Sequence, residues 1–351
     1  MAKVLMKGNE AIAEAAIIAG CRHYFGYPIT PQNEIPEYMS RRMKEVDGVF
    51  LQAESEIAAI NMVYGASGAG ARVMTSSSSP GISLKQEGLS YLATAELPHV
   101  VVNMVRGGPG LGGIQPAQSD YFQATRGGGH GDYRMVVYTP STVQEAAEMV
   151  VKAFDVADEY RMGVMILGDG MIGQIMEPVD LDVVTATGNT YKKDWASTGM
   201  DNHGGTRNVV NSLYIEPDVL EKVNRRLAGK YEVLATEVTD YEAYQCEDAD
   251  ILLVAYGTTA RICKNAVAMA REAGIKLGLF RPKTVWPFPY DALAKELDHC
   301  TDVISVEMSL GQMVDDVTIA SEGRAKVHFT GRTGGIIPTP REIVEFVKGV
   351  R

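Results

Sequence analysis

Two glutamates open a segment whose second half contains almost only small residues. Residues 53–70 read AESEIAAINMVYGASGAG, with Glu54 and Glu56 at the start. Interior glycine costs a helix about 1 kcal/mol relative to alanine, so a helix of this composition indicates that another group must approach its surface closely. Acids in a first turn are also common, because the helix dipole and the free N–H groups favour them. The segment alone leaves both a chemical and a structural role open for these carboxylates.

Three other segments place polar side chains where ligands are often bound. The turn GYPITP at 26–31 holds Thr30 between two prolines, either as a ligand hydroxyl or as the N-cap of the next helix. The segment TSSSSPG at 75–81 presents hydroxyls at a helix start, which suits an anion or an ordinary capped turn. Arg106 follows an apolar strand and precedes GGPGLGG. That position suits binding of a carboxylate or phosphate, with a plain surface arginine as the alternative.

Residues 108–113 imitate a dinucleotide-binding motif. Their glycines have the spacing G-x-G-x-x-G after a predicted strand. Pro109 interrupts the motif, however, and Ile114-Gln115-Pro116 stands where the apolar helix should begin. Without a helix N-terminus to hold a pyrophosphate, the pattern does not predict an NAD site.

Residues 168–170 imitate a second cofactor motif. Gly-Asp-Gly opens the magnesium–diphosphate motif of thiamine enzymes, which needs an asparagine roughly 25 to 30 residues further on to complete the cation's oxygen ligands. Asn189 and Asn202 lie on either side of that window. We therefore predict that Asp169 is a turn residue.

Composition excludes several classes of function. The chain has 351 residues with a net charge of −11, which argues against nucleic-acid binding because phosphate contacts need a basic surface. We expect a cytoplasmic location, since no segment has the roughly 18 apolar residues that a membrane span needs. The four cysteines at 21, 246, 263 and 300 form no C-x-x-C pair, so neither an iron–sulfur site nor any other metal site is predicted in this chain.

The elements that position these residues alternate between strand and helix, which predicts an α/β fold with a parallel sheet. We place the first strands at 23–25, 49–51, 72–75, 99–105, 135–137 and 163–167, and helices at 10–19, 31–44, 53–70, 82–94 and 142–159. The rhythm breaks in a polar segment and resumes after it, with a loop expected at 281–289. This predicts a first domain at 1–180, a linker or excursion at 181–247 and a smaller domain at 248–351.

These segments together resemble one family. GNEAIAEAA, GYPITP, the helix with Glu56, the strand ending in Arg106, and AYGTTAR with KLGLFRPKTVWPFP are similar to the alpha subunit of the thiamine-diphosphate-dependent 2-oxoacid:ferredoxin oxidoreductases. The resemblance covers almost the whole chain and is weakest at 176–247. GYPITPQNEIPEYM is most similar to the branched-chain (2-oxoisovalerate) members, and next to the 2-oxoglutarate members.

The resemblance implies a pyrimidine-binding domain followed by a transketolase C-terminal-like domain, with thiamine diphosphate shared with a partner. The pyrophosphate-domain beta subunit would hold Mg²⁺, and gamma and ferredoxin-like delta subunits would carry the iron–sulfur clusters. Glu56 matches the catalytic glutamate that hydrogen-bonds N1′ of the aminopyrimidine, with Tyr27 and Pro28 also at the cofactor. Thr30 and Arg106 match the substrate-binding positions.

The resemblance also implies a reaction: oxidative decarboxylation of a 2-oxoacid with coenzyme A, giving acyl-CoA and CO₂ and passing electrons to ferredoxin. The carboxyl at N1′ would promote the tautomer whose 4′-nitrogen takes a proton from the thiazolium carbon. Two alternatives share the two-domain layout. They are the beta subunit of a lipoamide-linked 2-oxoacid dehydrogenase and a non-catalytic structural subunit.

Overall fold

The computed structural model describes residues 3–186 and 188–350, and within them the first sheet has seven strands in the order β12-β6-β7-β5-β4-β2-β3. All neighbouring pairs except β12–β6 are parallel. The strands are β2 (His23–Gly26), β3 (Val49–Gln52), β4 (Val73–Ser77), β5 (His99–Val105), β6 (Val136–Tyr138), β7 (Gly163–Asp169) and β12 (Thr284–Trp286). The predicted parallel α/β sheet is therefore confirmed.

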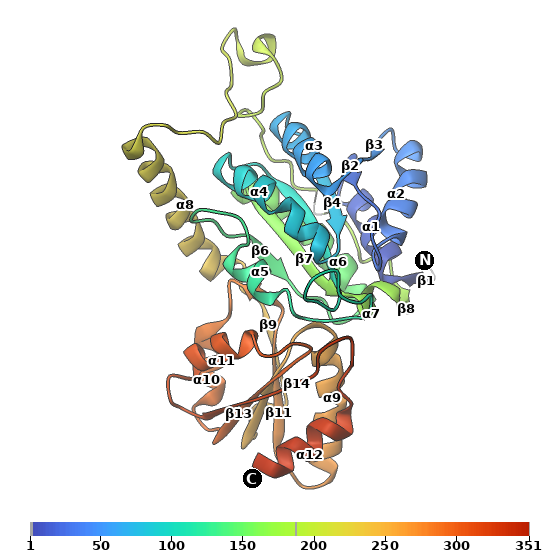
Figure 1. Ribbon diagram of the computed structural model, residues 1–351, viewed down its shortest axis with the longest axis vertical. Coiled ribbons are helices and arrows are strands. Elements are labelled where there is room, and N and C mark those ends of the chain that lie inside the picture. The colour runs from blue at the N-terminus through green and yellow to red at the C-terminus, as the bar shows by residue number, and fades with distance from the viewer. Residues whose placement is uncertain (1–2, 187, 351) are drawn as a thin grey trace.

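Helices cover both faces of this sheet, as a parallel sheet requires (Figure 1). Every residue of β5 and β7 is buried. One hydrophobic cluster joins the sheet to α1, α2 and α6, and another joins it to α3, α4 and α5. The helices are α1 (Gly8–Ile18), α2 (Glu34–Glu45), α3 (Glu56–Gly68), α4 (Pro80–Thr94), α5 (Tyr121–Arg126), α6 (Val143–Tyr160) and α7 (Gly170–Gln174).

A second sheet, with five strands among the described residues, has the order β14-β13-β10-β11-β9, with only β9 antiparallel. Its elements are β9 (Tyr241–Tyr244), β10 (Ile251–Val254), α9 (Gly257–Glu272), β11 (Leu277–Pro282), α10 (Tyr290–Leu297), β13 (Asp302–Glu307), α11 (Met313–Ser321), β14 (Lys326–Gly331) and α12 (Pro340–Val350). It lies below the first sheet in Figure 1. One hydrophobic cluster contains side chains from both parts, so their contact is a packed interface.

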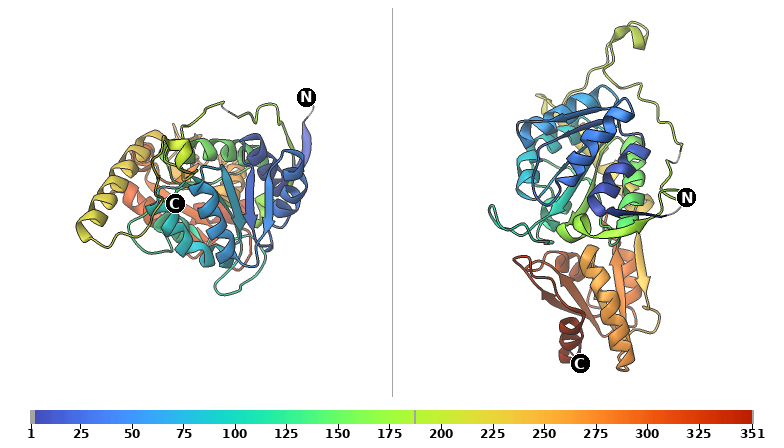
Figure 2. Two further views of the ribbon diagram at one scale, coloured as in Figure 1. Left: turned by 90° about the horizontal axis from the view of Figure 1, so that it is seen from above. Right: turned by 90° about the vertical axis from the view of Figure 1, so that its right-hand side faces the viewer.

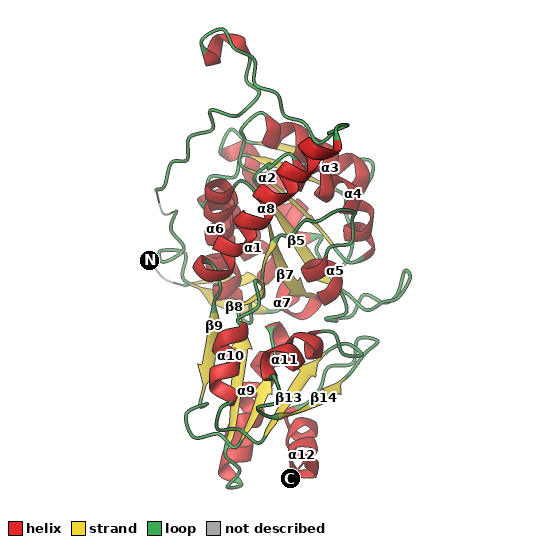
Figure 3. Cartoon of the chain, turned by 90° about the vertical axis from the view of Figure 1, so that its left-hand side faces the viewer, coloured by secondary structure: helices red, strands yellow, loops and turns green. Residues whose placement is uncertain are grey.

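The segment between the two sheets is partly regular. β8 (Met176–Val179) pairs with β1 (Val4–Lys7) in a small antiparallel sheet. A long arm with the 3-10 helix η1 (Met200–His203) then projects from the end of the molecule far from the second sheet (Figures 1 and 2). Helix α8 (Pro217–Glu237) crosses the side of the first domain (Figure 3). The domain boundaries at 180/181 and 247/248 stay predictions.

Three sequence expectations about elements are corrected. Helix α2 begins at Glu34, not at Pro31, because residues 29–32 form a turn closed by Gln32 N donating to Ile29 O. Helix α3 begins at Glu56, so Glu54 precedes the helix, because the extended Ser55 is the N-cap and accepts a hydrogen bond from Ala58 N. The expected loop at 281–289 contains β12, which pairs with β6 of the first sheet.

Among the described residues, no helix is both long and apolar enough to cross a membrane.

Candidate active site

The strands β5, β4, β2 and β3 are parallel neighbours, so the residues after them meet at one edge of the sheet. Arg106 follows β5, Ser78 and Ser79 follow β4, Thr30 lies in the turn after β2, and Glu56 comes after β3. Ligands of open parallel sheets bind at this carboxyl edge. The structure thus brings together the residues that the sequence singled out.

Glu56 is the first residue of α3 and is only 6% exposed. Its carboxylate lies against α4, since a Cβ built on Gly81 would be 2.6 Å from Glu56 Oε1 and 2.1 Å from Ser77 Oγ. Among the described residues, no hydrogen bond or ion pair joins this carboxylate to another group, and its oxygens are not among the buried side-chain atoms that lack a partner. The oxygens therefore keep access to solvent, where they can accept a hydrogen bond from an external group.

Arg106 is 6% exposed and connects two loops of the site by hydrogen bonds. Its guanidinium donates to Thr30 O at 2.9 Å and to Leu111 O at 3.1 Å. Its Nε is buried and has no hydrogen-bond partner among the described residues. Arg106 therefore braces the turn after β2 and the glycine-rich loop, and keeps donor capacity for a ligand.

The turn after β2 presents Tyr27, Pro28 and Thr30 at the surface. It is held from behind by Asn9 Nδ2 and Gln174 Nε2, which both donate to Pro31 O, at 2.8 and 3.0 Å. Thr30 is not an N-cap, since Asn33 precedes the first residue of α2. The sequence did not predict a tethering role for Asn9, which lies inside α1.

The hydroxyls of residues 75–78 face the interior, where all four residues are fully buried. Ser79 has a φ of 24°, a strained conformation for a non-glycine residue. Its N–H donates to Asn103 Oδ1 at 3.1 Å and its hydroxyl donates to Asp120 Oδ2 at 2.7 Å, and these bonds hold the strained turn. Burial raises the pKa of the Asp120 carboxyl. This segment is a rigid support for the start of α4.

Two cavities open at the same edge. One of about 620 Å³ includes Thr30, Ile114, Met171, Ile175 and Ile337 in its lining. The other, of about 590 Å³, lies between Pro80 and the 107–110 loop on one side and Ser309 and Gly334 of the second domain on the other. Both cavities thus combine residues of the two domains.

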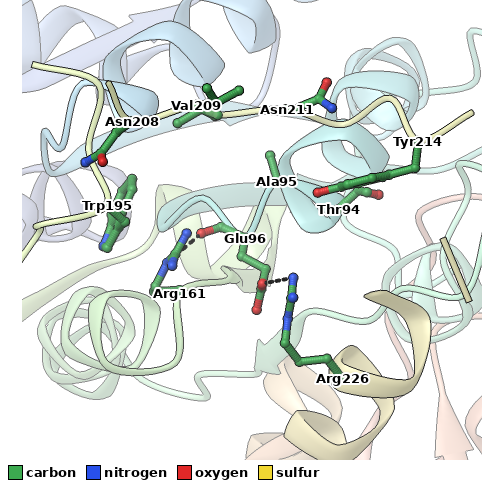
Figure 4. A pocket seen from close by; sticks show the side chains of 11 residues that line it. Thr94, Ala95, Glu96, Arg161, Trp195, Asn208, Val209, Asn211, Tyr214 and Arg226 are labelled. Carbon is green, nitrogen blue, oxygen red and sulfur yellow. Dashed lines mark hydrogen bonds and ion pairs between the residues drawn. The ribbon is translucent and has the colours of Figure 1, made fainter. Parts of the chain in front are cut away.

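A third cavity, of about 520 Å³, lies elsewhere, between the arm, α8 and the loop after α4 (Figure 4). Glu96 binds Arg226 and Lys230 there, and the Arg161 guanidinium stacks 4.5 Å from the Trp195 ring. Glu96 and Arg161 precede β5 and β7. The cavity is therefore at the amino ends of the strands, opposite Glu56, and its charged groups attach α8 and the arm to the domain.

Asp169, for which the sequence predicted a turn residue, lies at the junction of a strand and a helix. It ends β7 and caps α7, accepting hydrogen bonds from Met171 N at 2.9 Å and Ile172 N at 3.2 Å. It also accepts a hydrogen bond from Thr258 of the second domain. The pattern at 108–113 leads into no helix, because α5, the next helix in the described chain, begins at Tyr121.

Family comparisons agree with this geometry. Residues 14–253 match the model described as pyruvate flavodoxin/ferredoxin oxidoreductase, thiamine diphosphate-binding. The chain belongs to this family. Residues 249–343 match pyruvate:ferredoxin oxidoreductase core domain II.

Two curated relatives match this chain over nearly its whole length. The chain is 47% identical over 350 residues to ketoisovalerate oxidoreductase subunit VorB of Methanothermobacter thermautotrophicus, covering 100% of this chain and 98% of that one. It is 36% identical to 2-oxoglutarate synthase subunit KorA of the same organism, covering 97% of each chain. The chain is therefore a subunit of a 2-oxoacid:ferredoxin oxidoreductase, and the resemblance inferred from its motifs is confirmed.

Solved structures support the same fold. A 2-oxoglutarate:ferredoxin oxidoreductase from Magnetococcus marinus, with 2-oxoglutarate, coenzyme A and succinyl-CoA bound, matches with a TM-score of 0.89 and 27% identity, over 99% of this chain. The present chain spans only 65% of that solved chain. A split-gene transketolase matches with a TM-score of 0.58 at 12% identity, over 98% of this chain and 97% of that chain, which shows the shared fold alone.

One buried charged residue near this edge was not predicted from the sequence. Lys85 of α4 is fully buried, and its Nζ donates to Thr75 Oγ1 at 3.1 Å. Its burial could have been predicted from two glycines on the same helix. Gly81, Lys85 and Gly88 follow one another at helical intervals and so share one face of α4.

Proposed function

We propose that this chain supplies half of a thiamine-diphosphate site that decarboxylates a branched-chain 2-oxoacid, with 2-oxoisovalerate favoured and 2-oxoglutarate next. A beta subunit would supply the pyrophosphate-binding half with Mg²⁺. Gamma and delta subunits would carry the iron–sulfur clusters that pass electrons to ferredoxin, and coenzyme A would accept the acyl group. The observation that carries the proposal is the carboxylate of Glu56, which has no hydrogen-bond partner among the described residues and lies at the carboxyl edge of the sheet.

The residues of this edge fit the aminopyrimidine end of the cofactor. Glu56 offers a carboxyl group without a protein partner, next to the bare surface of Gly81. Tyr27 and Pro28 are exposed on the neighbouring turn, where they would contact the ring. When bound, the cofactor supplies an electron sink for the decarboxylation.

In this scheme each residue has a separate task. Glu56 hydrogen-bonds the N1′ position and holds or gives up a proton there. The free donor capacity of Arg106 and the hydroxyl of Thr30 orient the carboxylate of the substrate. The fully buried Ser77 lies beside the Glu56 carboxylate at Gly81 and limits where that carboxylate can move.

The preference for a branched substrate has two supports. VorB is more similar to this chain than KorA is, at 47% against 36% identity. The cavity at Thr30 also has apolar side chains in its wall, contributed by Ile114, Met171 and Ile337. An aliphatic chain suits that wall better than a second carboxylate does.

The exposed face of α3 is where we place the partner subunit. Ile57, Asn61, Gly65 and Ala69 follow one another every fourth residue and are all exposed. Ile57 is 49% exposed, and a Cβ on Gly65 would meet nothing within 4 Å. This exposed row of residues, two of which are small, lets a helix of the partner subunit pack closely beside Glu56.

The test is Glu56→Gln in the reconstituted complex. We expect oxoacid-dependent viologen reduction to fall by about a hundredfold or more, because glutamine cannot exchange the proton at N1′. The matched control is Glu54→Gln, since Glu54 is exposed and precedes the helix. A panel of 2-oxoacids assayed with the wild-type complex tests the substrate. Near wild-type activity of assembled Glu56→Gln would remove Glu56 from the mechanism.

A further inference from the structure

Asp120 joins the chain after the glycine-rich loop to the turn after β4. It directly precedes α5 and belongs to the wall of the cavity of about 590 Å³ between the two domains. Its Oδ2 accepts hydrogen bonds from Ser79 Oγ at 2.7 Å and from Asn103 Nδ2 at 2.9 Å. One carboxylate oxygen thus serves two neutral donors, one that follows β4 and one on the neighbouring strand β5.

Ser79 connects this carboxylate to Arg106. The Ser79 hydroxyl accepts a hydrogen bond from Arg106 N at 3.0 Å while it donates to Asp120. The hydroxyl has one hydrogen, and the charged Asp120 oxygen is a nearer acceptor for it than Arg106 O at 3.3 Å. Asn103 closes the same cluster, because its Oδ1 accepts from Ser79 N at 3.1 Å. The main chain at Arg106 is therefore held by the turn before α4.

The same turn leads into the part of α4 that lies against Glu56. Gly81 is the second residue of α4, and a Cβ there would be 2.6 Å from Glu56 Oε1. Ser79 has a φ of 24°, which a non-glycine residue keeps only where surrounding contacts impose it. The hydrogen bonds of the cluster are such contacts. Without them the turn can relax, and the start of α4 moves with it.

We infer that Asp120 is a positioning residue for the reaction, which acts through Ser79 on Arg106 and on the start of α4. It thereby fixes the spacing between the Arg106 guanidinium and the Glu56 carboxylate. The inference rests on the proposed roles of those two residues.

Asp120 serves as an acceptor more than as a charge. Both of its hydrogen bonds go to the same oxygen, and burial raises the pKa of its carboxyl, so the ionised form is already disfavoured there. A neutral amide oxygen at the same place can accept both bonds. This distinguishes Asp120→Asn, which keeps the acceptor, from Asp120→Ala, which removes it.

The first test compares these two variants in the reconstituted complex, with rates expressed per bound thiamine diphosphate. In Asp120→Ala, kcat should fall and KM for the 2-oxoacid should rise, each by about threefold or more, because both site residues are displaced. Asp120→Asn should recover most of both losses. A purely structural role would lower the yield of folded complex and leave both constants per site unchanged, and that result would overturn the inference. Asp132→Ala, the same change at an exposed position after α5, is the matched control.

A second readout needs neither cofactor nor turnover. Hydrogen exchange of the Arg106 amide is followed in the cofactor-free complex by mass spectrometry of overlapping peptides. This amide is bonded to Ser79 Oγ, so Asp120→Ala should speed its exchange by about tenfold or more, and Asp120→Asn should restore most of the protection. Unchanged exchange in a folded Asp120→Ala complex would contradict the inference, whereas the proposed function fails only if Glu56→Gln stays active.

Ser79→Gly covers the case in which Asp120→Ala does not fold. Glycine accepts the positive φ without strain, but the hydroxyl that links Asp120 to Arg106 is removed. This variant should reproduce the kinetic and exchange changes expected for Asp120→Ala, and wild-type behaviour would equally overturn the inference. Because the two residues act in one chain of bonds, the double variant should lose about as much kcat/KM as the worse single variant. Losses that multiply would mean that Asp120 does not act through Ser79.

Discussion

Arg106 has two separable functions at the scale of the residue. Two of its donors hold Thr30 O and Leu111 O, and its Nε is buried without a partner. In Arg106→Ala we expect kcat/KM for the 2-oxoacid to fall about a hundredfold or more, because a charge-assisted contact to the substrate carboxylate is lost and the turn is loosened. Thiamine diphosphate retained by the complex, measured after gel filtration, should stay near the wild-type level.

The control for this prediction is Arg341→Ala, an exposed arginine at the start of α12. It removes the same charge at a distance from the site, so both activity and cofactor content should stay unchanged. If Arg106→Ala lost the cofactor but used bound 2-oxoacid normally, the proposed substrate contact of Arg106 would be wrong.

The candidate site residues were predictable to different degrees. Thr30 and Arg106 could be singled out because each follows a strand of a parallel sheet, and such ends share one edge. Glu56 was singled out by the small residues of its helix and by the family resemblance. The residues that support them could not. Lys85 occupies a helix position of a type that is usually solvated, and its burial depends on two glycines meeting another helix.

At the scale of the element, the start of α4 sets the position of the Glu56 carboxylate. A methyl group in Gly81→Ala would lie 2.1 Å from Ser77 Oγ and 2.6 Å from Glu56 Oε1, so both side chains must shift in a packed region. We therefore expect the free energy of unfolding to fall by about 1–3 kcal/mol, while activity falls by about tenfold or more because the carboxylate is displaced. Parallel assays of urea unfolding and viologen reduction measure the two effects.

Gly229→Ala is the matched change in α8, where an added Cβ meets nothing within 4 Å. It should stabilise the protein by up to about 1 kcal/mol through helix propensity and leave activity unchanged. Equal activities for Gly81→Ala and the wild type would show that close packing against Gly81 does not position Glu56.

The composition of residues 53–70 predicted a helix with many small residues, and α3 is that helix. Its first residue was predicted less well, because Ser55 takes an extended conformation and caps the helix with its own hydroxyl. The start of α2 at Glu34 was missed for a similar reason, since the preceding turn is held by hydrogen bonds from α1 and α7. Tertiary contacts of this kind leave no local pattern.

At the scale of the whole molecule, the alternation of strands and helices predicted both sheets. It did not predict β12, which leaves the second part of the chain to pair with β6, or β9, which precedes the second domain in the chain yet joins its sheet. Both are short antiparallel edge strands. The pairing of β12 with β6 depends on how the two domains meet, and a hydrophobic cluster shared by both domains fixes that arrangement.

Gln118 is one of the polar connections across this domain interface. Its Nε2 donates to Tyr256 O at 2.8 Å, and its Oε1 accepts from Thr259 Oγ1 and Met308 N, each at 2.9 Å. In Gln118→Ala these buried groups lose their partner, so we expect a loss of about 3 kcal/mol in the free energy of unfolding. Calorimetry should show the second domain unfolding before the first, because the interface is weakened while each core stays intact.

The control is Gln52→Ala, measured in the same way, since Gln52 is exposed and a surface change of this kind costs at most about 0.5 kcal/mol of unfolding free energy.

The two cavities at the carboxyl edge of the first sheet are both lined by residues of the two domains. Gln118→Ala should therefore also raise KM for the 2-oxoacid, even though Gln118 is fully covered and lines neither cavity. A single transition at the wild-type temperature would mean that the hydrogen bonds of Gln118 are not needed to hold the domains together.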